Sequence, residues 1–245
     1  MKDNIQDLVK YVTTTGFFDK IKINATDEKV TIEALEKEKD VVLKGVFGKP
    51  ISNLRGEFGL SNLSLLAHIA SDQEFSSPDS TLEVIYEKKN NEDVPVELKY
   101  VNKSKSHINY RFMAANLVPP QPTFREPEWD VVVKPAKAKI EQFAWAANGL
   151  SAYEQYFIPK LEDGELKFYI GDANAASQRG AVTFATDLKG TFNNKNKWRI
   201  EHIQPVLKLA ISADCEMAFS TKGVIQITIN TGVGVYQFIF PAKSA

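Results

Sequence analysis

The sequence predicts an α+β protein that contains two copies of one structural unit, and three observations carry this prediction. Amphipathic stripes with helical spacing recur at matching places in the two halves of the 245-residue chain. Strand-like segments stand between and after these stripes in the same order in both halves. A proline-rich stretch, residues 116–129, separates the halves near the midpoint. The predicted order in each half is helix, strands, short helix, strands.

Each half opens with a predicted helix, and the two apolar stripes lie 135 residues apart: Ile5, Leu8, Val9 and Val12 in the first half, and Ile140, Phe143, Ala144 and Ala147 in the second. A shorter helix follows later in each half, with stripes 140 residues apart: Leu63, Leu66, Ala67 and Ala70, then Ile203, Val206, Leu207 and Ala210. Ser61 precedes the first short helix and is the expected N-cap.

Strand-like alternation fills the segments between the helices. Residues 17–48 alternate around a turn at NATDE, and residues 157–190 repeat that course with EDGE as a tighter hairpin turn. Further hairpins close each half at 81–101, 107–114 and 215–242. We therefore predict a first domain at 1–115, a connector at 116–128 and a second domain at 129–245. The prolines of VPPQP favour an extended, stiff connector.

Composition narrows the possible functions. A formal net charge of −1 argues against DNA coating through bulk positive charge, but leaves room for a basic face. One cysteine, Cys215, rules out an internal disulfide, and three scattered histidines are too few for a Cys/His zinc site. No apolar run approaches the roughly 18 residues of a membrane span. These features favour an intracellular protein without a metal or membrane contact.

A search for catalytic motifs predicts no catalytic residue and no cofactor. The segment GVFGKP at Gly45 lacks the spacing of a phosphate loop, and GVGVYQ at Gly232 leads into a strand and not a helix, so both are expected to be turns. Cys215 has no basic neighbour to activate it. Trp145 and the aromatic residues of 153–157 have no interleaved Arg or Lys, and we expect them to pack the second-half helix on its sheet.

The duplicated helix and strand order, the connector at the midpoint and the ending VGVYQFIFPAKSA together resemble the sliding clamps of DNA replication. The resemblance is to the two-domain type of T4-like bacteriophages and of proliferating cell nuclear antigen, and it covers essentially the whole chain. It implies two clamp domains with helices on one face of antiparallel sheets, in a homotrimeric ring around duplex DNA. It also implies a clamp-loader ATPase and a DNA polymerase tail peptide as partners, an intracellular location in the infected host, and no chemistry.

The same resemblance implies three sets of site residues. The polar helix faces would line the hole and attract phosphates without reading bases, although Asp7 and Glu141 dilute their positive charge. The expected DNA-facing residues are Lys2, Lys10, His68, Lys137, Lys139, Gln204 and Lys208. Edge strands at 107–114 and 180–187 would join subunits, through His107, Asn109, Tyr110, Phe112, Ala181, Thr183 and Phe184. A pocket beside the connector would bind partner peptides through Leu35, Val42, Leu117, Val118, Pro119 and Pro241.

Two other functions stay open at this point. A duplicated α+β enzyme would place its active site between the halves, where distant residues converge. A phage structural protein would only oligomerise through its strand edges.

Overall fold

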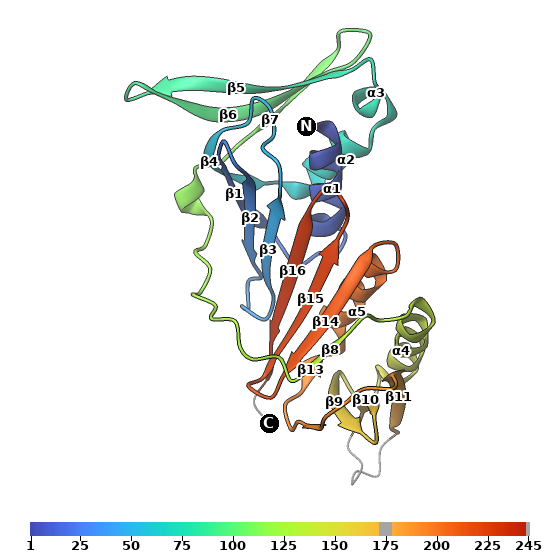
Figure 1. Ribbon diagram of the computed structural model, residues 1–245. Helices are drawn as coiled ribbons and strands as arrows, with labels where there is room; N and C mark the ends of the chain where they lie inside the picture. The colour runs from blue at the N-terminus through green and yellow to red at the C-terminus, as the bar shows by residue number, and fades with distance from the viewer. Residues whose placement is uncertain (172–177, 244–245) are drawn as a thin grey trace. The chain divides into compact units, whose positions relative to one another are not determined.

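A computed structural model describes residues 1–171 and 178–243 (Figure 1). Residues 172–177, which fall inside the predicted strand region 157–190, and residues 244–245 lie outside the described residues. The chain forms two compact units. The first contains Met1–Pro122 and Asn230–Tyr236, and the second contains Thr123–Ile229 and the chain from Gln237 onward.

The first unit begins with a helix and continues as antiparallel strands. Its elements are α1 (Lys2–Thr13), β1 (Lys20–Ala25), β2 (Val30–Leu35), β3 (Val42–Phe47), β4 (Gly56–Ser61), α2 (Leu63–Ser71), α3 (Gln73–Ser76), β5 (Thr81–Lys89), β6 (Glu92–Val101), β7 (His107–Arg111) and a 3-10 turn at Ala115–Leu117. The strands are ordered β4-β1-β2-β3 in one sheet and β5-β6-β7 in another.

The second unit repeats this course. Its elements are β8 (Val131–Val133), α4 (Lys137–Leu150), β9 (Tyr156–Glu162), β10 (Glu165–Ile170), β11 (Gly180–Ala185), β12 (Phe192–Asn193), β13 (Trp198–Arg199), α5 (Ile200–Ala210), β14 (Asp214–Ser220), β15 (Val224–Asn230) and β16 (Val235–Pro241). The last residue of β15 and the first two of β16 belong to the first unit. The strands are ordered β11-β10-β9-β12, with β13 also paired to β9, and β16-β15-β14-β8.

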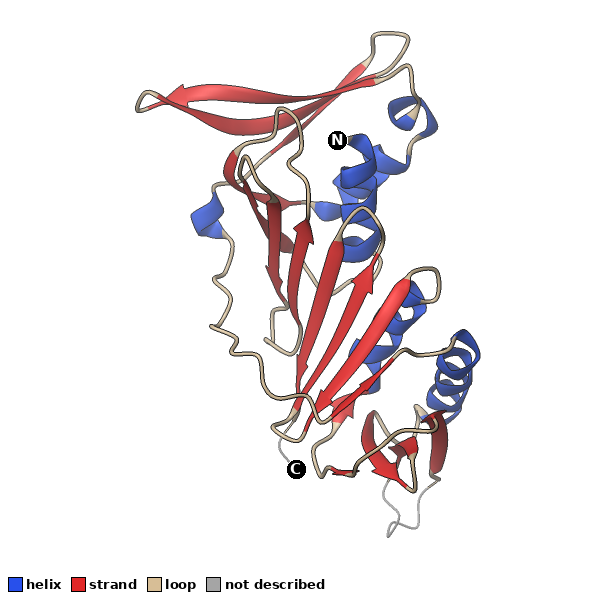
Figure 2. Cartoon of the chain, viewed as in Figure 1, coloured by secondary structure: helices blue, strands red, loops and turns tan. Residues whose placement is uncertain are grey.

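This architecture confirms the predicted fold class. Strands dominate the chain and the helices are few (Figure 2). Helix α1 corresponds to α4 and helix α2 to α5, and each pair is followed by strands in the same order. The Asp163–Gly164 turn of the predicted EDGE hairpin has φ of 52° and 78°, as a tight two-residue hairpin requires.

The helical stripes are confirmed with local corrections. Val9, Ala67 and Ala144 are only half-buried, whereas Tyr11 and Ile69, which the stripes omitted, are buried. The predicted cap at Ser61 is wrong because Ser61 pairs with Lys20 as the last residue of β4. Asn62 is the N-cap instead, with φ of 59°, a left-handed conformation that asparagine tolerates.

Helix α1 holds the Asn230–Tyr236 segment in the first unit. Asp7 Oδ2 accepts hydrogen bonds from Thr231 Oγ1 at 3.0 Å and from the Tyr236 hydroxyl at 2.8 Å. The ring of Tyr11 stacks on that of Tyr236 with centroids 5.0 Å apart. One carboxylate and one aromatic pair therefore attach a distant part of the chain to this helix.

Asp7→Asn should change the pH dependence of stability. Burial raises the pKa of Asp7 above its ordinary value of 3.8 and outweighs the two hydrogen bonds, which lower it. A raised folded-state pKa means that Asp7 stabilises the fold most below the unfolded-state pKa, and that this contribution is lost as pH rises through the folded-state value. In urea titrations from about pH 3 to about pH 7, we expect wild-type stability to fall relative to Asp7→Asn. A relative gain for wild type would show that the hydrogen bonds outweigh burial.

Candidate functional site

In each unit a glutamine side chain joins two helices. In the first unit, Gln6 Nε2 on α1 donates to the carbonyl oxygen of Ala70 on α2 at 3.3 Å. In the second unit, Gln204 Nε2 on α5 donates to the carbonyl oxygen of Ala144 at 3.3 Å and to Asn148 Oδ1 at 3.0 Å. Gln204 was expected to face DNA, but its amide group already links α5 to α4.

Lys2 is also held by neighbouring groups. Its ammonium donates to the carbonyl oxygen of Ser77 at 2.7 Å and to Ser80 Oγ at 2.6 Å, and it also bonds the carbonyl oxygen of Ser80. These bonds fix the ammonium of Lys2 on the loop after α3, and the predicted role of Lys2 toward DNA stays a prediction. The ammonium of Lys10 lies 5.2 Å from the centre of the Tyr11 ring.

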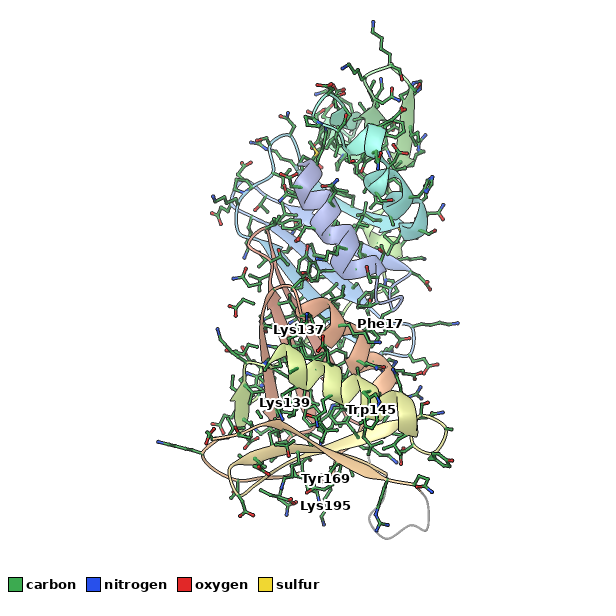
Figure 3. All side chains as sticks on the ribbon, turned by 90° about the vertical axis from the view of Figure 1, so that its right-hand side faces the viewer. Phe17, Lys137, Lys139, Trp145, Tyr169 and Lys195 are labelled. Carbon is green, nitrogen blue, oxygen red and sulfur yellow. The ribbon has the colours of Figure 1, made fainter. Side chains whose placement is uncertain are left out.

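The other predicted DNA-facing residues lie on the surface. His68 on α2 and Lys208 on α5 are exposed. On α4, Lys137 is exposed with its Nζ 3.8 Å from Glu141 Oε1, and half-buried Lys139 has its Nζ 3.5 Å from Gln142 Oε1 (Figure 3). Their role toward DNA stays a prediction.

Trp145 on α4 is the feature that the sequence reasoning misjudged. Phe157 packs in the core as expected, but Trp145 is 79 % exposed and Tyr153 is 60 % exposed. The helical spacing carried the missing signal: Ile140, Phe143 and Ala147 form the buried face, and position 145 lies about 140° around the helix from position 140. Trp145 therefore projects from the surface of α4 (Figure 3).

The strands predicted to join subunits both lie at sheet edges. Strand β7 pairs with β6, and β11 pairs with β10, each as the outermost strand of its described sheet. Their residues divide by orientation: His107, Asn109 and Ala181 are exposed, Thr183 is half-buried, and Phe112 stacks on Phe58 with centroids 4.1 Å apart.

Two predicted interface side chains point inward. Tyr110 and Phe184 are each 1 % exposed, and the Tyr110 hydroxyl donates a hydrogen bond to the carbonyl oxygen of Ser61. Successive side chains of a strand point to opposite faces of its sheet. The residues just before and just after Tyr110 and Phe184 therefore point away from the core. The prediction that the side chains of Tyr110 and Phe184 reach the interface is therefore corrected, because both belong to the core. A neighbouring subunit could contact only the strand backbones and the exposed side chains beside them.

The start of the connector is attached to the first unit. Gln121 Nε2 donates to the carbonyl oxygens of Ala34 at 2.8 Å and Leu43 at 2.6 Å. Gly59 exchanges two 2.9 Å backbone hydrogen bonds with Met113. A Cβ on Gly59 would lie 2.7 Å from Val118 Cγ2. The connector thus lies closely on β2, β3 and β4 as far as Gln121.

The predicted peptide-binding residues are unequally accessible. Leu117 is 59 % exposed, Pro119 and Pro241 are exposed, and Leu35 is half-buried. Val42 and Val118 are 4 % and 5 % exposed, so their side chains belong to the core of the first unit and offer little surface. Leu117 is the most prominent apolar side chain of the connector.

Neither the Cys215 thiol nor the clustering of His, Cys, Asp and Glu side chains indicates a catalytic or metal site in the described residues. Burial raises the pKa of Cys215 to about 12, with the negative charges of Asp214 and Glu216 adding to the effect, so its thiol stays protonated at neutral pH. Within residues 1–171 and 178–243, no three His, Cys, Asp or Glu side chains gather as a metal site. In the same residues no helix is long and apolar enough to cross a membrane.

Comparison with known proteins identifies the fold. No protein-family model matches the sequence. No curated protein matches it either. Among solved structures, proliferating cellular nuclear antigen from Entamoeba histolytica matches with a TM-score of 0.68 and 14 % identity, covering 99 % of this chain and 96 % of that one. PCNA from Thermococcus kodakaraensis matches with a TM-score of 0.69 and 13 % identity, covering 99 % and 97 %.

A third matched structure is that of a complex. The structure of the C-terminal region of FEN-1 bound to A. fulgidus PCNA gives a TM-score of 0.72 and 12 % identity, covering 98 % of this chain and 96 % of that one. These likenesses extend over nearly the whole of each chain. The protein has the sliding-clamp fold.

Proposed function

From this fold we propose that the protein is a sliding clamp, which closes as a homotrimeric ring around duplex DNA and tethers a replicative DNA polymerase. The observation that carries the proposal is the likeness to PCNA over 98–99 % of the chain, with both units included. On this proposal the protein is a scaffold and not an enzyme, acts inside the cell where DNA is copied, and is opened by a clamp-loader ATPase.

The two edge strands support ring closure. Strand β7 of one subunit would pair with β11 of the next, a head-to-tail contact whose repetition closes a ring. Each strand is the outermost of its described sheet, and unpaired edges of this kind favour pairing with another chain. Exposed His107, Asn109 and Ala181 would flank the new ladder.

The connector supports peptide binding. We propose that a partner's tail peptide covers Leu117 and Pro119 of the first unit, with Leu35 as a further contact. Leu117 is an exposed apolar anchor on a backbone that Gln121 holds in place, which lowers the conformational entropy lost on binding. The bound C-terminal region of FEN-1 on A. fulgidus PCNA is a precedent for this kind of partner.

The decisive experiment compares retention on circular and linear DNA. Three chains of 27.4 kDa should sediment as a ring of about 82 kDa. After loading, the ring should remain on closed circular duplex DNA. It should dissociate rapidly once that DNA is cut, because the ring is retained by encircling the DNA and not by its affinity for it. Equal retention on both forms would refute the proposal.

A matched variant connects retention to the edge strands. His107→Glu combined with Ala181→Glu puts like charges beside both edges, which disfavours their pairing. We expect dissociation to monomers and loss from circular DNA, with the fold intact because both positions are exposed. A trimer that persists unchanged would place the subunit contact elsewhere.

A further inference from the structure

Trp145 stands on a face of α4 that is polar and lacks a partner in the described part of its unit. It is the most exposed large apolar side chain among the described residues, at 79 %. Lys137 and Glu141 precede it by eight and four positions and share its side of the helix. Lys139 lies on the same helix, and Figure 3 shows both lysines and Trp145 along it.

The chemistry around Trp145 suits a phosphate-rich partner. The carboxylate of Glu141, one turn before Trp145, lies 3.8 Å from the ammonium of Lys137, which balances its charge. No further carboxylate occurs from Gln142 to the end of α4 at Leu150, or in the three residues that follow. An indole offers a flat apolar surface that packs on a deoxyribose and one N–H that donates to a phosphate oxygen. Neither contact reads bases, so neither would trap the protein at a particular sequence.

We propose that Trp145 lies directly against the sugar–phosphate backbone of DNA inside the ring. This inference rests on the proposed function, because α4 faces DNA only if the chain closes as a clamp. Lysines attract DNA at a distance through solvent, whereas an indole acts only in contact. Trp145 therefore adds a short-range contact that slows diffusion of the clamp along DNA without adding sequence preference.

The three tryptophans make this contact measurable. Trp198 is buried and its Nε1 donates to the carbonyl oxygen of Phe240 at 2.9 Å. Trp129 is half-buried, with its Nε1 3.0 Å from Glu126 Oε1. Acrylamide quenching should therefore report mainly Trp145, and the difference between wild type and Trp145→Phe isolates its signal.

The experiment measures this difference for free protein and for protein loaded on nicked circular duplex without other proteins bound. We expect acrylamide quenching of Trp145 to fall by about half on DNA, because contact covers one of the two faces of the indole. We also expect Trp145→Ala to remain on circular DNA as long as wild type, and to diffuse faster along it.

The alternative outcomes separate the two proposals. Retention on circular DNA with unchanged quenching would overturn the Trp145 contact and leave the clamp function standing. Failure of retention would overturn both. Protection of Trp145 only after a polymerase is added would overturn the DNA contact and assign the surface to a protein partner.

Discussion

Phe143→Ala should lower the free energy of unfolding of the second unit by about 3–5 kcal/mol. Phe143 is fully buried on α4, and its ring lies 5.3 Å from Phe157, 5.2 Å from Phe168 and 6.3 Å from Phe184, centroid to centroid. These partners come from β9, β10 and β11, so the substitution opens a cavity where the helix meets its sheet. Urea denaturation followed by near-UV circular dichroism measures the loss.

Trp145→Ala is the matched control for Phe143→Ala. It removes a larger aromatic side chain from the same helix two positions away, but from the exposed face. We expect a change within about 0.5 kcal/mol. Equal losses for both variants would contradict the assignment of the buried and exposed faces of α4.

Tyr110→Asp should destabilise the first unit by about 4 kcal/mol or more. The tyrosine is 1 % exposed, and its hydroxyl bonds the carbonyl oxygen of Ser61 at the end of β4. The substitution leaves a cavity and removes the hydroxyl that bonds the carbonyl oxygen of Ser61. It also buries a carboxyl group, which must either stay protonated or lose its hydration as a charged group. Hydrogen exchange of β4 and β7 measures the effect.

His107→Asp controls for the introduced charge, because it puts the same residue on the exposed side of the same strand. We expect its folding stability to stay within about 0.5 kcal/mol of wild type. A fully folded Tyr110→Asp variant would contradict the inward orientation of Tyr110. Loss of oligomers in that variant would report unfolding, so the ring interface is better probed at His107 and Ala181.

The fold could be predicted because hydrophobic periodicity records which face of each element is buried. The stripes Ile5–Leu8–Val12 and Ile203–Val206–Leu207 lie in the core, and the two halves repeat one order of elements. The boundaries of the helices and strands were harder to predict from the sequence. Ser61 is a good helix cap by residue type, but pairing with Lys20 places it in a strand.

The candidate site was less predictable because it depends on what side chains bond at a distance in sequence. Nothing local distinguishes Lys2, which bonds Ser77 and Ser80, from a solvated lysine. The same holds for Gln204, which bonds α4 across 60 positions. Trp145 is different: its exposure followed from the spacing of the apolar stripe, and the assumption that aromatic residues pack inward concealed it.

Gly59 also constrains how the chain could be redesigned. Met113 and Val118 leave no room for a methyl group at this position, and Gln121 attaches the chain again three residues after Val118. The stretch from 113 to 121 therefore behaves as part of the first unit, whatever its proline content suggests. We expect the protein to tolerate insertions or affinity tags that lengthen the connector after Pro122. Insertions before Pro122 should destabilise the first unit, because each added residue would displace a segment that is bonded to it.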